Sequence, residues 1–311
     1  MPHKTDWFRD RKWGIFIHLL DSAQNNPDRA VNMGAGKTDW SEYIDSLDVD
    51  LIADQIAETN AGYLCLTVMQ LRKYMLAPNE TYDKITGYRP GEACARRDFI
   101  EDMYNALDRR GIDLLLYYTG DGPSIDPQAS EALGITKDKV DIGFVKNWAD
   151  VLKDYSVKYG KKVKAWWLDG CYSFIGYDEP LLKILADAAK VGNPDALVAL
   201  NDGVKERVSV YSKYDDFTAG EMTEFRELPD NRFVDGTQWH ILSYLGIPLD
   251  GSRWNGWCQP GTEYTGEYMR EYVTKVNERG GVVTVDVCMF RDGHIDKDQM
   301  KVLRALKDIR K

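Results

Sequence analysis

The stretch KAWWLDG, residues 164–170, decides the fold that this sequence predicts. It has the character of a short buried strand that ends on a carboxylate, Asp169, and is closed by a glycine. In a parallel α/β barrel the functional side chains lie at the carboxyl ends of the strands. Two indoles beside an acid also suit a sugar pocket, because indole faces cover apolar surface while the polar edge stays available. A core strand that ends on a turn-forming aspartate is the alternative interpretation.

Similar apolar runs alternate with helical patterns along the rest of the chain. The clearest strands are predicted at residues 13–20, 63–69, 112–119, 163–168, 196–200 and 282–289, and the helices at 49–60, 98–110, 144–159, 179–191, 264–279 and 296–309. Segments 208–217 and 239–245 bring the set to about eight strands. Nearly continuous apolar strands indicate a parallel sheet that is covered on its outside.

The length of the chain favours one particular parallel architecture. A chain of 311 residues fits a (β/α)8 TIM-type barrel in a single domain, residues 1–311. A doubly wound open sheet is the alternative. Long stretches follow several predicted strands, at residues 21–48, 70–97 and 120–143. In a barrel these stretches lie on the carboxyl side of the strands, where loops build the site.

Composition limits the partners that the chain can have. The net charge is −10, and acids and bases are interspersed, so no basic stripe is present to neutralise phosphates. We therefore expect no nucleic-acid partner. No apolar run approaches the roughly 18 residues that a membrane span needs, and the N-terminus shows no apolar signal segment. The compartment stays open, because a removed signal would indicate a secreted or periplasmic protein. The oligomeric state also stays open.

Motifs for metals, nucleotides and disulfides are weak. The run GAGKT at residues 34–38 resembles the end of a phosphate loop, but Val31 stands where the first glycine is required. The four histidines include no i, i+4 pair, and no acidic run has the spacing of a calcium loop. The five cysteines are scattered without CxxC spacing and are expected to be free thiols. We therefore expect no metal and no cofactor.

Paired carboxylates are the more informative signal. Glycoside hydrolysis usually needs two acids that flank the scissile bond, one ionised and one protonated. Asp169 is the first candidate. The segment DDFTAGEMTE, residues 215–224, supplies several candidates for the second acid. Solvated loop acids are the alternative interpretation of that segment.

At this point the sequence resembles the α-L-fucosidase family of retaining glycoside hydrolases. KWGIFIH at residues 12–18 is similar to the opening strand of that family, and WWLDG at residues 166–170 is similar to its nucleophile strand. Looser similarity, at residues 113–120, 216–221 and 280–293, extends the resemblance over essentially the whole chain, as a divergent member with the catalytic barrel only. The resemblance implies two-step hydrolysis of a terminal glycoside. Asp169 would be the nucleophile and Glu221 the acid/base, with Glu224 as an alternative acid.

One departure from the family changes the expected sugar. The family generally carries Lys-His-His-Asp-Gly-Phe after its second strand, and the matching run here is MQLRKY, residues 69–74. Two histidines that contact fucose in the family are absent, and each lost hydrogen bond removes about 1 kcal/mol. We therefore expect a sugar other than unmodified L-fucose. Gln70 and Arg72 are predicted to bind a different hydroxyl pattern or an anionic group. Asn201 begins the run that stands where the family tends to carry an arginine.

The remaining predicted substrate-binding residues have rings that could contact a sugar. They are His18, Trp40, Tyr118, Trp167 and Trp239. Trp239 belongs to a late cluster with Trp254 and Trp257, and this cluster is predicted to stack on the leaving-group sugar. Two other classes stay open. One is a carbohydrate-binding relative that has lost catalysis, and the other is a barrel enzyme of different chemistry, such as an isomerase or a metal-dependent aldolase.

Overall fold

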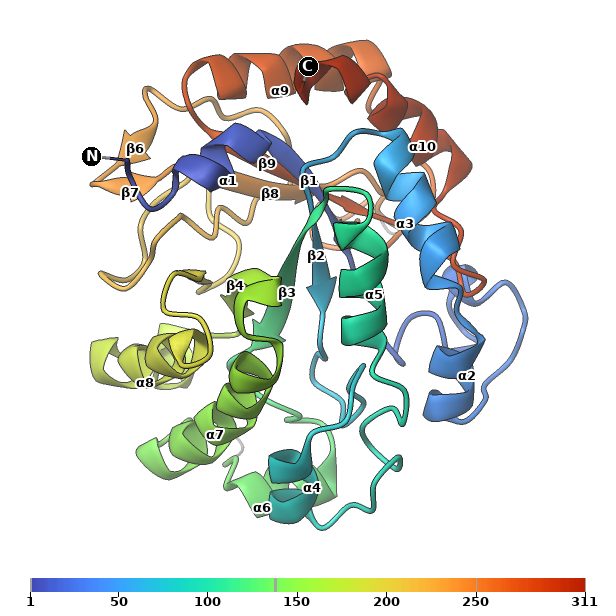
Figure 1. Cartoon of the computed structure of the whole chain (residues 1–311), viewed down its shortest axis with the longest axis vertical. Coiled ribbons are helices and arrows are strands. Elements are labelled where there is room, and N and C mark those ends of the chain that lie inside the picture. Colours follow the sequence, from blue (N-terminus) through green and yellow to red (C-terminus); the bar gives the residue numbers. More distant parts are fainter. Residues whose placement is uncertain (1, 137–138, 250, 311) are drawn as a thin grey trace.

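A curled parallel sheet forms the centre of the molecule (Figure 1). The computed structural model describes residues 2–136, 139–249 and 251–310. Within these residues seven parallel strands lie in the order β5-β4-β3-β2-β1-β9-β8. Their bounds are β1 Trp13–Ile17, β2 Tyr63–Thr67, β3 Asp113–Thr119, β4 Val163–Asp169, β5 Leu197–Leu200, β8 His240–Tyr244 and β9 Val282–Val287. A short antiparallel hairpin, β6 Phe233–Val234 and β7 Thr237–Gln238, stands apart from this sheet.

The strand order distinguishes between the two predicted architectures. Strands β1 to β5 lie beside their neighbours in the sequence, and β1 also pairs with the last strand, β9. A doubly wound sheet reverses its strand order at an internal switch point, and this sheet does not. The winding is therefore that of the barrel class, and the structure shows it as a curled sheet of seven regular strands.

Helices cover the outer side of the curled sheet (Figure 1). Five of the longer ones begin at aspartates whose carboxylates accept hydrogen bonds from the first free backbone N–H groups: Asp48, Asp98, Asp141, Asp178 and Asp296. Such a cap stabilises a helix by about 1 kcal/mol. The helices are α1 Asp6–Arg11, α2 Trp40–Ser46, α3 Val49–Glu58, α4 Glu80–Thr86, α5 Phe99–Asp108, α6 Pro127–Leu133, α7 Ile142–Tyr159, α8 Glu179–Lys190, α9 Gly266–Glu278 and α10 Lys297–Arg304.

Side chains of each strand alternate between two cores. An outer core fills the space between the sheet and the helices, and a smaller inner core lies on the concave side. On β4, Trp166 belongs to the outer core and Trp167 to the inner one; on β3, Tyr118 is outer and Tyr117 inner. Successive side chains of a strand point to opposite faces. This alternation therefore decides which aromatic residues can reach a site on the concave side.

Residues 215–222 lie between the two edge strands, β5 and β8. The Asp216 N–H donates to Val198 O of β5 at 2.8 Å, and the Met222 N–H donates to Leu242 O of β8 at 2.9 Å. On the β5 side two carboxylates replace part of a backbone ladder, because Asp215 and Asp216 accept the N–H groups of Leu200 at 2.8 Å and Val198 at 2.9 Å.

The predicted strand at 208–217 therefore needs correction. In the described residues only isolated bridges form in this region, Phe217 with Gln238 and Glu221 with Leu242. The physical reason is that side-chain acceptors satisfy the β5 edge and that Gly220, at φ 62°, turns the backbone out of the extended conformation. The other late prediction, 239–245, coincides with β8.

Candidate active site

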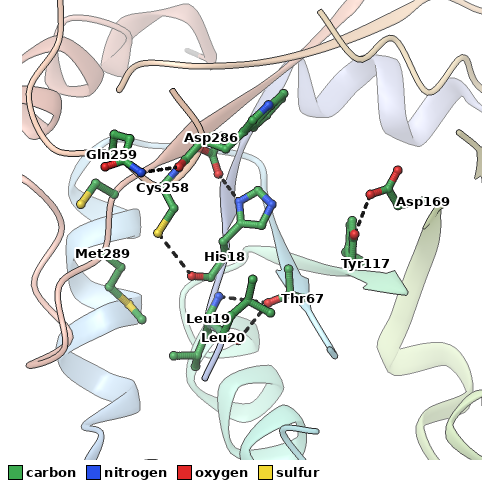
Figure 2. Close-up of polar contacts among 12 residues, drawn as sticks. His18, Leu19, Leu20, Thr67, Tyr117, Asp169, Cys258, Gln259, Asp286 and Met289 are labelled. Atoms are coloured by element: carbon green, nitrogen blue, oxygen red, sulfur yellow. Dashed lines mark hydrogen bonds and ion pairs between the residues drawn. The ribbon is translucent and has the colours of Figure 1, made fainter. Parts of the chain in front are cut away.

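Asp169 lies at the carboxyl end of β4, as the sequence predicted, and its side chain faces the concave side of the sheet. It is 9% exposed. Its Oδ2 accepts a hydrogen bond from the Tyr117 hydroxyl at 2.6 Å (Figure 2). Its Oδ1 accepts one from the Asn201 amide at 2.7 Å. Two donors from neighbouring strands therefore hold this carboxylate in a fixed orientation.

Glu221 shares the same amide group. Asn201 Nδ2 also donates to Glu221 Oε2 at 2.6 Å. The orientation of the amide is determined, since its Oδ1 accepts the Gly203 N–H at 3.2 Å. One nitrogen thus touches both acids, so the bonded oxygens of Asp169 and Glu221 lie within about 5 Å of each other. Retaining glycosidases place their two carboxyl groups about 5–5.5 Å apart.

The environment changes the protonation behaviour of Glu221. Burial, together with the charge of Asp169, raises the pKa of Glu221 to about 8, although the hydrogen bond from Asn201 opposes this rise. Glu221 is therefore mostly protonated at neutral pH and able to donate a proton. Asp121, just beyond β3, is a third acid in this region, and burial raises its pKa to about 7. The charge of Asp169 also raises the pKa of the nearby Tyr172 hydroxyl.

A cavity of about 540 Å³ lies beside these two acids. Its size falls within the range of about 300–1,000 Å³ that is usual for small-molecule sites. Five of the nine predicted site residues line it: His18, Gln70, Trp167, Asp169 and Glu221. The indole N–H of Trp167 donates to Ala219 O at 3.1 Å, which links β4 to the segment that carries Glu221.

His18 is held by a buried carboxylate. Its Nδ1 lies 2.6 Å from Asp286 Oδ1, and Asp286 Oδ2 also accepts the backbone N–H of Cys258 at 2.9 Å. Figure 2 shows the other ring nitrogen of His18 turned toward Tyr117 and Asp169. A carboxylate on one ring nitrogen fixes the orientation of the ring and leaves the other nitrogen for a ligand.

Two predicted residues after the first two strands lie away from this cavity. Trp40 is buried in the outer core, where its indole N–H donates to Met75 O at 2.8 Å and its ring packs against Tyr43 and Tyr74. Arg72 is half exposed, and its guanidinium lies 4.0 Å from Asp21. Neither side chain lines the cavity.

Tyr118 and Trp239 lie on the outer side of the sheet. The Tyr118 ring stacks on Trp148 of α7 at 4.7 Å, and its hydroxyl donates to the Trp148 carbonyl. Trp239 packs in the outer core against Gly281. Glu224, the alternative acid, forms ion pairs with Arg226 and Arg253 and does not line the central cavity.

Several residues that the sequence did not assign belong to the site. The register of β3 and β4 pairs Tyr117 with Trp167 and Thr119 with Asp169, so the inner face carries Tyr117 rather than its neighbour. The sequence carried no signal that separates Tyr117 from Tyr118, because the pairing register of β3 with β4 decides which of the two faces inward. No sequence signal pointed to Asn201 as a bridge or to Asp286. Arg29 lines the cavity and forms no ion pair within the described part of the chain.

The described residues show neither a metal-binding cluster nor a membrane-spanning helix. These residues contain no group of three His, Cys, Asp or Glu side chains that could hold a metal ion. The helices among them include none that is both long and apolar enough to cross a bilayer. All five cysteines are buried free thiols in this structure.

Solved structures of fucose-acting enzymes share this fold. No protein-family description and no curated protein matches the sequence. An endo-fucoidan hydrolase of glycoside hydrolase family 107 matches 99% of this chain and 93% of its own, with a TM-score of 0.72 and 16% identity. An α-L-fucosidase GH29 from Bacteroides thetaiotaomicron matches 99% of this chain and 73% of its own, with a TM-score of 0.67 and 16% identity.

A third structure, a fucosyltransferase mutant of the α-L-fucosidase AlfC, matches 99% of this chain and 98% of its own. Its TM-score is 0.67 and its identity 16%. At such identities the likeness establishes the fold, that of the barrel domains in this class of proteins. It does not transfer an activity.

Proposed function

We propose that this protein is a retaining glycoside hydrolase that acts on an α-L-fucoside or a closely related sugar. The observation that carries the proposal is the bridge from Asn201 to Asp169 and Glu221. It brings two carboxyl groups to the separation that the two-step mechanism uses, and one of them has a raised pKa. The fold shared with fucose-acting hydrolases supports the choice of sugar class.

In this proposal Asp169 is the nucleophile and Glu221 is the acid/base. Asp169 attacks the anomeric carbon while Glu221 gives its proton to the departing oxygen, and a glycosyl-enzyme forms. Asp169 has then lost its charge, so the pKa of Glu221 falls and Glu221 can take a proton from the attacking water. Tyr117 and Asn201 keep the nucleophile oriented during attack.

The proposed sugar-binding residues surround this pair. His18 and Gln70 bind hydroxyl groups, and Trp167 offers its ring beside Tyr117, on which it stacks at 5.5 Å. In this proposal Arg29, rather than the predicted Arg72, is the cation of the site. A guanidinium that lines the cavity and has no ion pair among the described residues favours a sugar with an anionic substituent, because a guanidinium binds carboxylate or sulfate through two parallel hydrogen bonds.

We also infer that residues 215–222 complete the barrel as its eighth member, in a single domain. Hydrogen bonds from this segment to both β5 and β8 support this. This arrangement explains how Glu221 comes to face Asp169, since both residues then lie at the same rim of the barrel, at the carboxyl ends of its strands.

Hydrolysis of aryl glycosides tests the proposal. The wild-type protein should cleave an aryl α-L-fucoside or an aryl glycoside of a related sugar and release the sugar with its anomeric configuration retained, which NMR of the first product detects. Asp169→Asn should lower kcat by about a thousandfold or more, because the nucleophile is removed. Wild-type turnover in Asp169→Asn would remove the assignment.

A carbohydrate-binding protein without catalysis is the second candidate. The absence of two histidines in the run at residues 69–74 favours it. Calorimetry with the same sugars separates the two candidates, because a binding protein would bind a sugar whose aryl glycoside it leaves intact.

A further inference from the structure

Two further cavities lie beside the central one. The first, of about 190 Å³, shares Trp254 with the central cavity. The second, of about 530 Å³, shares Thr223, Glu224 and Arg226 with the first. The three cavities therefore lie next to one another, and we call the two outer ones together the Trp254 groove. Its walls also include Lys205, Glu206, Met222, Tyr244, Arg253, Glu263, Tyr264 and Tyr268.

The groove adjoins the side of the site on which Glu221 lies. The chain passes from Glu221, in the wall of the central cavity, directly to Met222 and Thr223, which line the groove. A general acid must reach the oxygen of the departing group to protonate it. The groove is therefore on the leaving-group side of the bond that would be cleaved.

The groove has the chemistry of a sugar-binding surface. Trp254 is 63% exposed, which leaves an indole face open between the central cavity and the groove. An indole supplies broad apolar contact to a sugar ring and keeps a polar N–H available. Beyond Trp254, the tyrosines Tyr244, Tyr264 and Tyr268 add aromatic surface with polar ends.

The groove is lined by as many basic as acidic side chains: Lys205, Arg226 and Arg253 against Glu206, Glu224 and Glu263. Glu224 pairs with both Arg226 and Arg253, and Lys205 pairs with Asp202 at 2.6 Å. Paired charges leave donors and acceptors at the surface but no excess field for an anion. Uncharged, hydroxyl-rich sugar residues fit this surface better than a phosphate or a polyanion does.

We propose that the Trp254 groove binds two or more sugar residues on the leaving-group side of the cleaved bond, so that the substrate is an oligosaccharide or polysaccharide rather than a small glycoside. This inference rests on the proposed function. It adds to that function the length of the substrate and the side on which it extends.

Chain-length kinetics test the inference. The probes are para-nitrophenyl α-L-fucoside and reducing-end-labelled α-L-fucose oligosaccharides of two to five residues. For the wild-type protein kcat/KM should rise at least tenfold from the disaccharide to the pentasaccharide, and the labelled products of the tri- to pentasaccharides should carry two or more sugars. Trp254→Ala should reduce the ratio of kcat/KM on the pentasaccharide to that on the aryl fucoside at least tenfold, mainly through KM.

Two variants control the experiment. Trp254→Phe keeps an aromatic face and should restore most of the ratio. Val157→Ala removes an exposed apolar side chain near the end of α7, close to the start of β4 and thus at the opposite end of that strand from Asp169. It should leave the ratio at the wild-type value.

The outcomes separate this inference from the function on which it rests. Cleavage of the aryl fucoside without any dependence on chain length, or an equal ratio in Trp254→Ala and wild type, would overturn the groove assignment alone. If neither an α-L-fucoside nor a glycoside of a related or sulfated sugar were cleaved or bound at any length, the proposed function would fail and the groove assignment would fail with it.

Discussion

At the scale of single residues, the amide of Asn201 is the feature on which the site depends. Its Nδ2 reaches both carboxylates, and the Gly203 N–H and the backbone bond to Leu168 O hold it in place. The hydrogen bond that it gives to Glu221 opposes the rise in the pKa of that acid. Asn201 is thus a positioning residue that separates the two acids and limits the affinity of Glu221 for its proton.

The variant Asn201→Ala should change the pH dependence of catalysis. Without the amide, the charge of Asp169 and burial act on Glu221 unopposed, so the pKa of Glu221 rises further. Activity requires protonated Glu221 and is lost as pH rises through that pKa, so the basic limb of the kcat/KM profile should move upward from about pH 8. The looser orientation of Asp169 should also lower kcat, by about tenfold to a hundredfold.

A full pH–rate profile on an aryl α-L-fucoside measures both effects. Glu224→Gln serves as the matched control, because Glu224 pairs with two arginines outside the central cavity. The basic limb of the kcat/KM profile of this variant should stay near pH 8. A basic limb that is the same in Asn201→Ala and wild type would show that the amide does not act on Glu221.

Part of this residue-level picture was accessible from the sequence, and part was not. Asp169 and Glu221 were predicted from strand-end chemistry and from a family resemblance, and both reach the central cavity. The sequence predicted Tyr118 rather than Tyr117 as a sugar-binding residue, because only the pairing register of β3 with β4 shows which of the two adjacent tyrosines faces inward. The bridging amide depends on three segments meeting in space, which no local pattern encodes.

At the scale of elements, residues 215–222 are the part of the structure that the sequence described least well. The regular strands are apolar runs, and these were predicted. This segment bonds to β5 partly through the side chains of Asp215 and Asp216, so it lacks the alternating pattern of a strand. Helices α2, α4 and α6 lie within the long stretches that were expected to be loops. Each has only seven residues, too few for a periodic pattern to stand out.

Gly220→Ala should destabilise the fold through this segment. Gly220 has φ 62°, and an added Cβ would lie 2.0 Å from the His240 carbonyl oxygen of β8. The substitution should therefore lower the free energy of unfolding by on the order of 3 kcal/mol, from backbone strain and from displacement of the segment against β8. Urea unfolding followed by circular dichroism measures this change.

Gly236→Ala separates the two contributions. Gly236 also has a positive φ, 82°, but an added Cβ would meet nothing within 4 Å. It should cost only the conformational strain, about 1 kcal/mol. Equal destabilisation in the two variants would mean that the segment moves away from β8 without cost.

At the scale of the whole molecule, the buried titratable groups predict how stability depends on pH. Burial raises the pKa of Asp121 and of Asp215 to about 7, and that of Glu221 to about 8. The folded state therefore keeps protons that the unfolded state has released above about pH 4, and the free energy of unfolding falls as pH rises through 7–8. Burial lowers the pKa of His240 to about 4, so its contribution is present above pH 6.5 and is lost as pH falls through 4.

Together these groups should make the protein less stable at pH 8 than at pH 5. Between pH 5 and pH 8 the three acids lower the free energy of unfolding as pH rises, and the histidine raises it. The three acids outweigh the histidine, so Tm should fall as pH rises. Glu221→Gln removes one of the acids and should reduce the fall, although Glu221 is only partly buried and contributes less than a fully buried acid. Thermal unfolding at several pH values measures this. A Tm that is constant or that rises over the range would contradict the expected balance.

The exposure of Trp254 gives the molecule an optical reporter. The chain has nine tryptophans, and among the large hydrophobic side chains that are well exposed in the described residues, Trp254 is the only indole. Water-exposed indoles emit fluorescence at longer wavelengths than buried ones, so the red edge of the emission spectrum should come mainly from this residue. A carbohydrate that covers it should shift the emission to the blue, and titration of that shift would give an affinity without labels and without turnover.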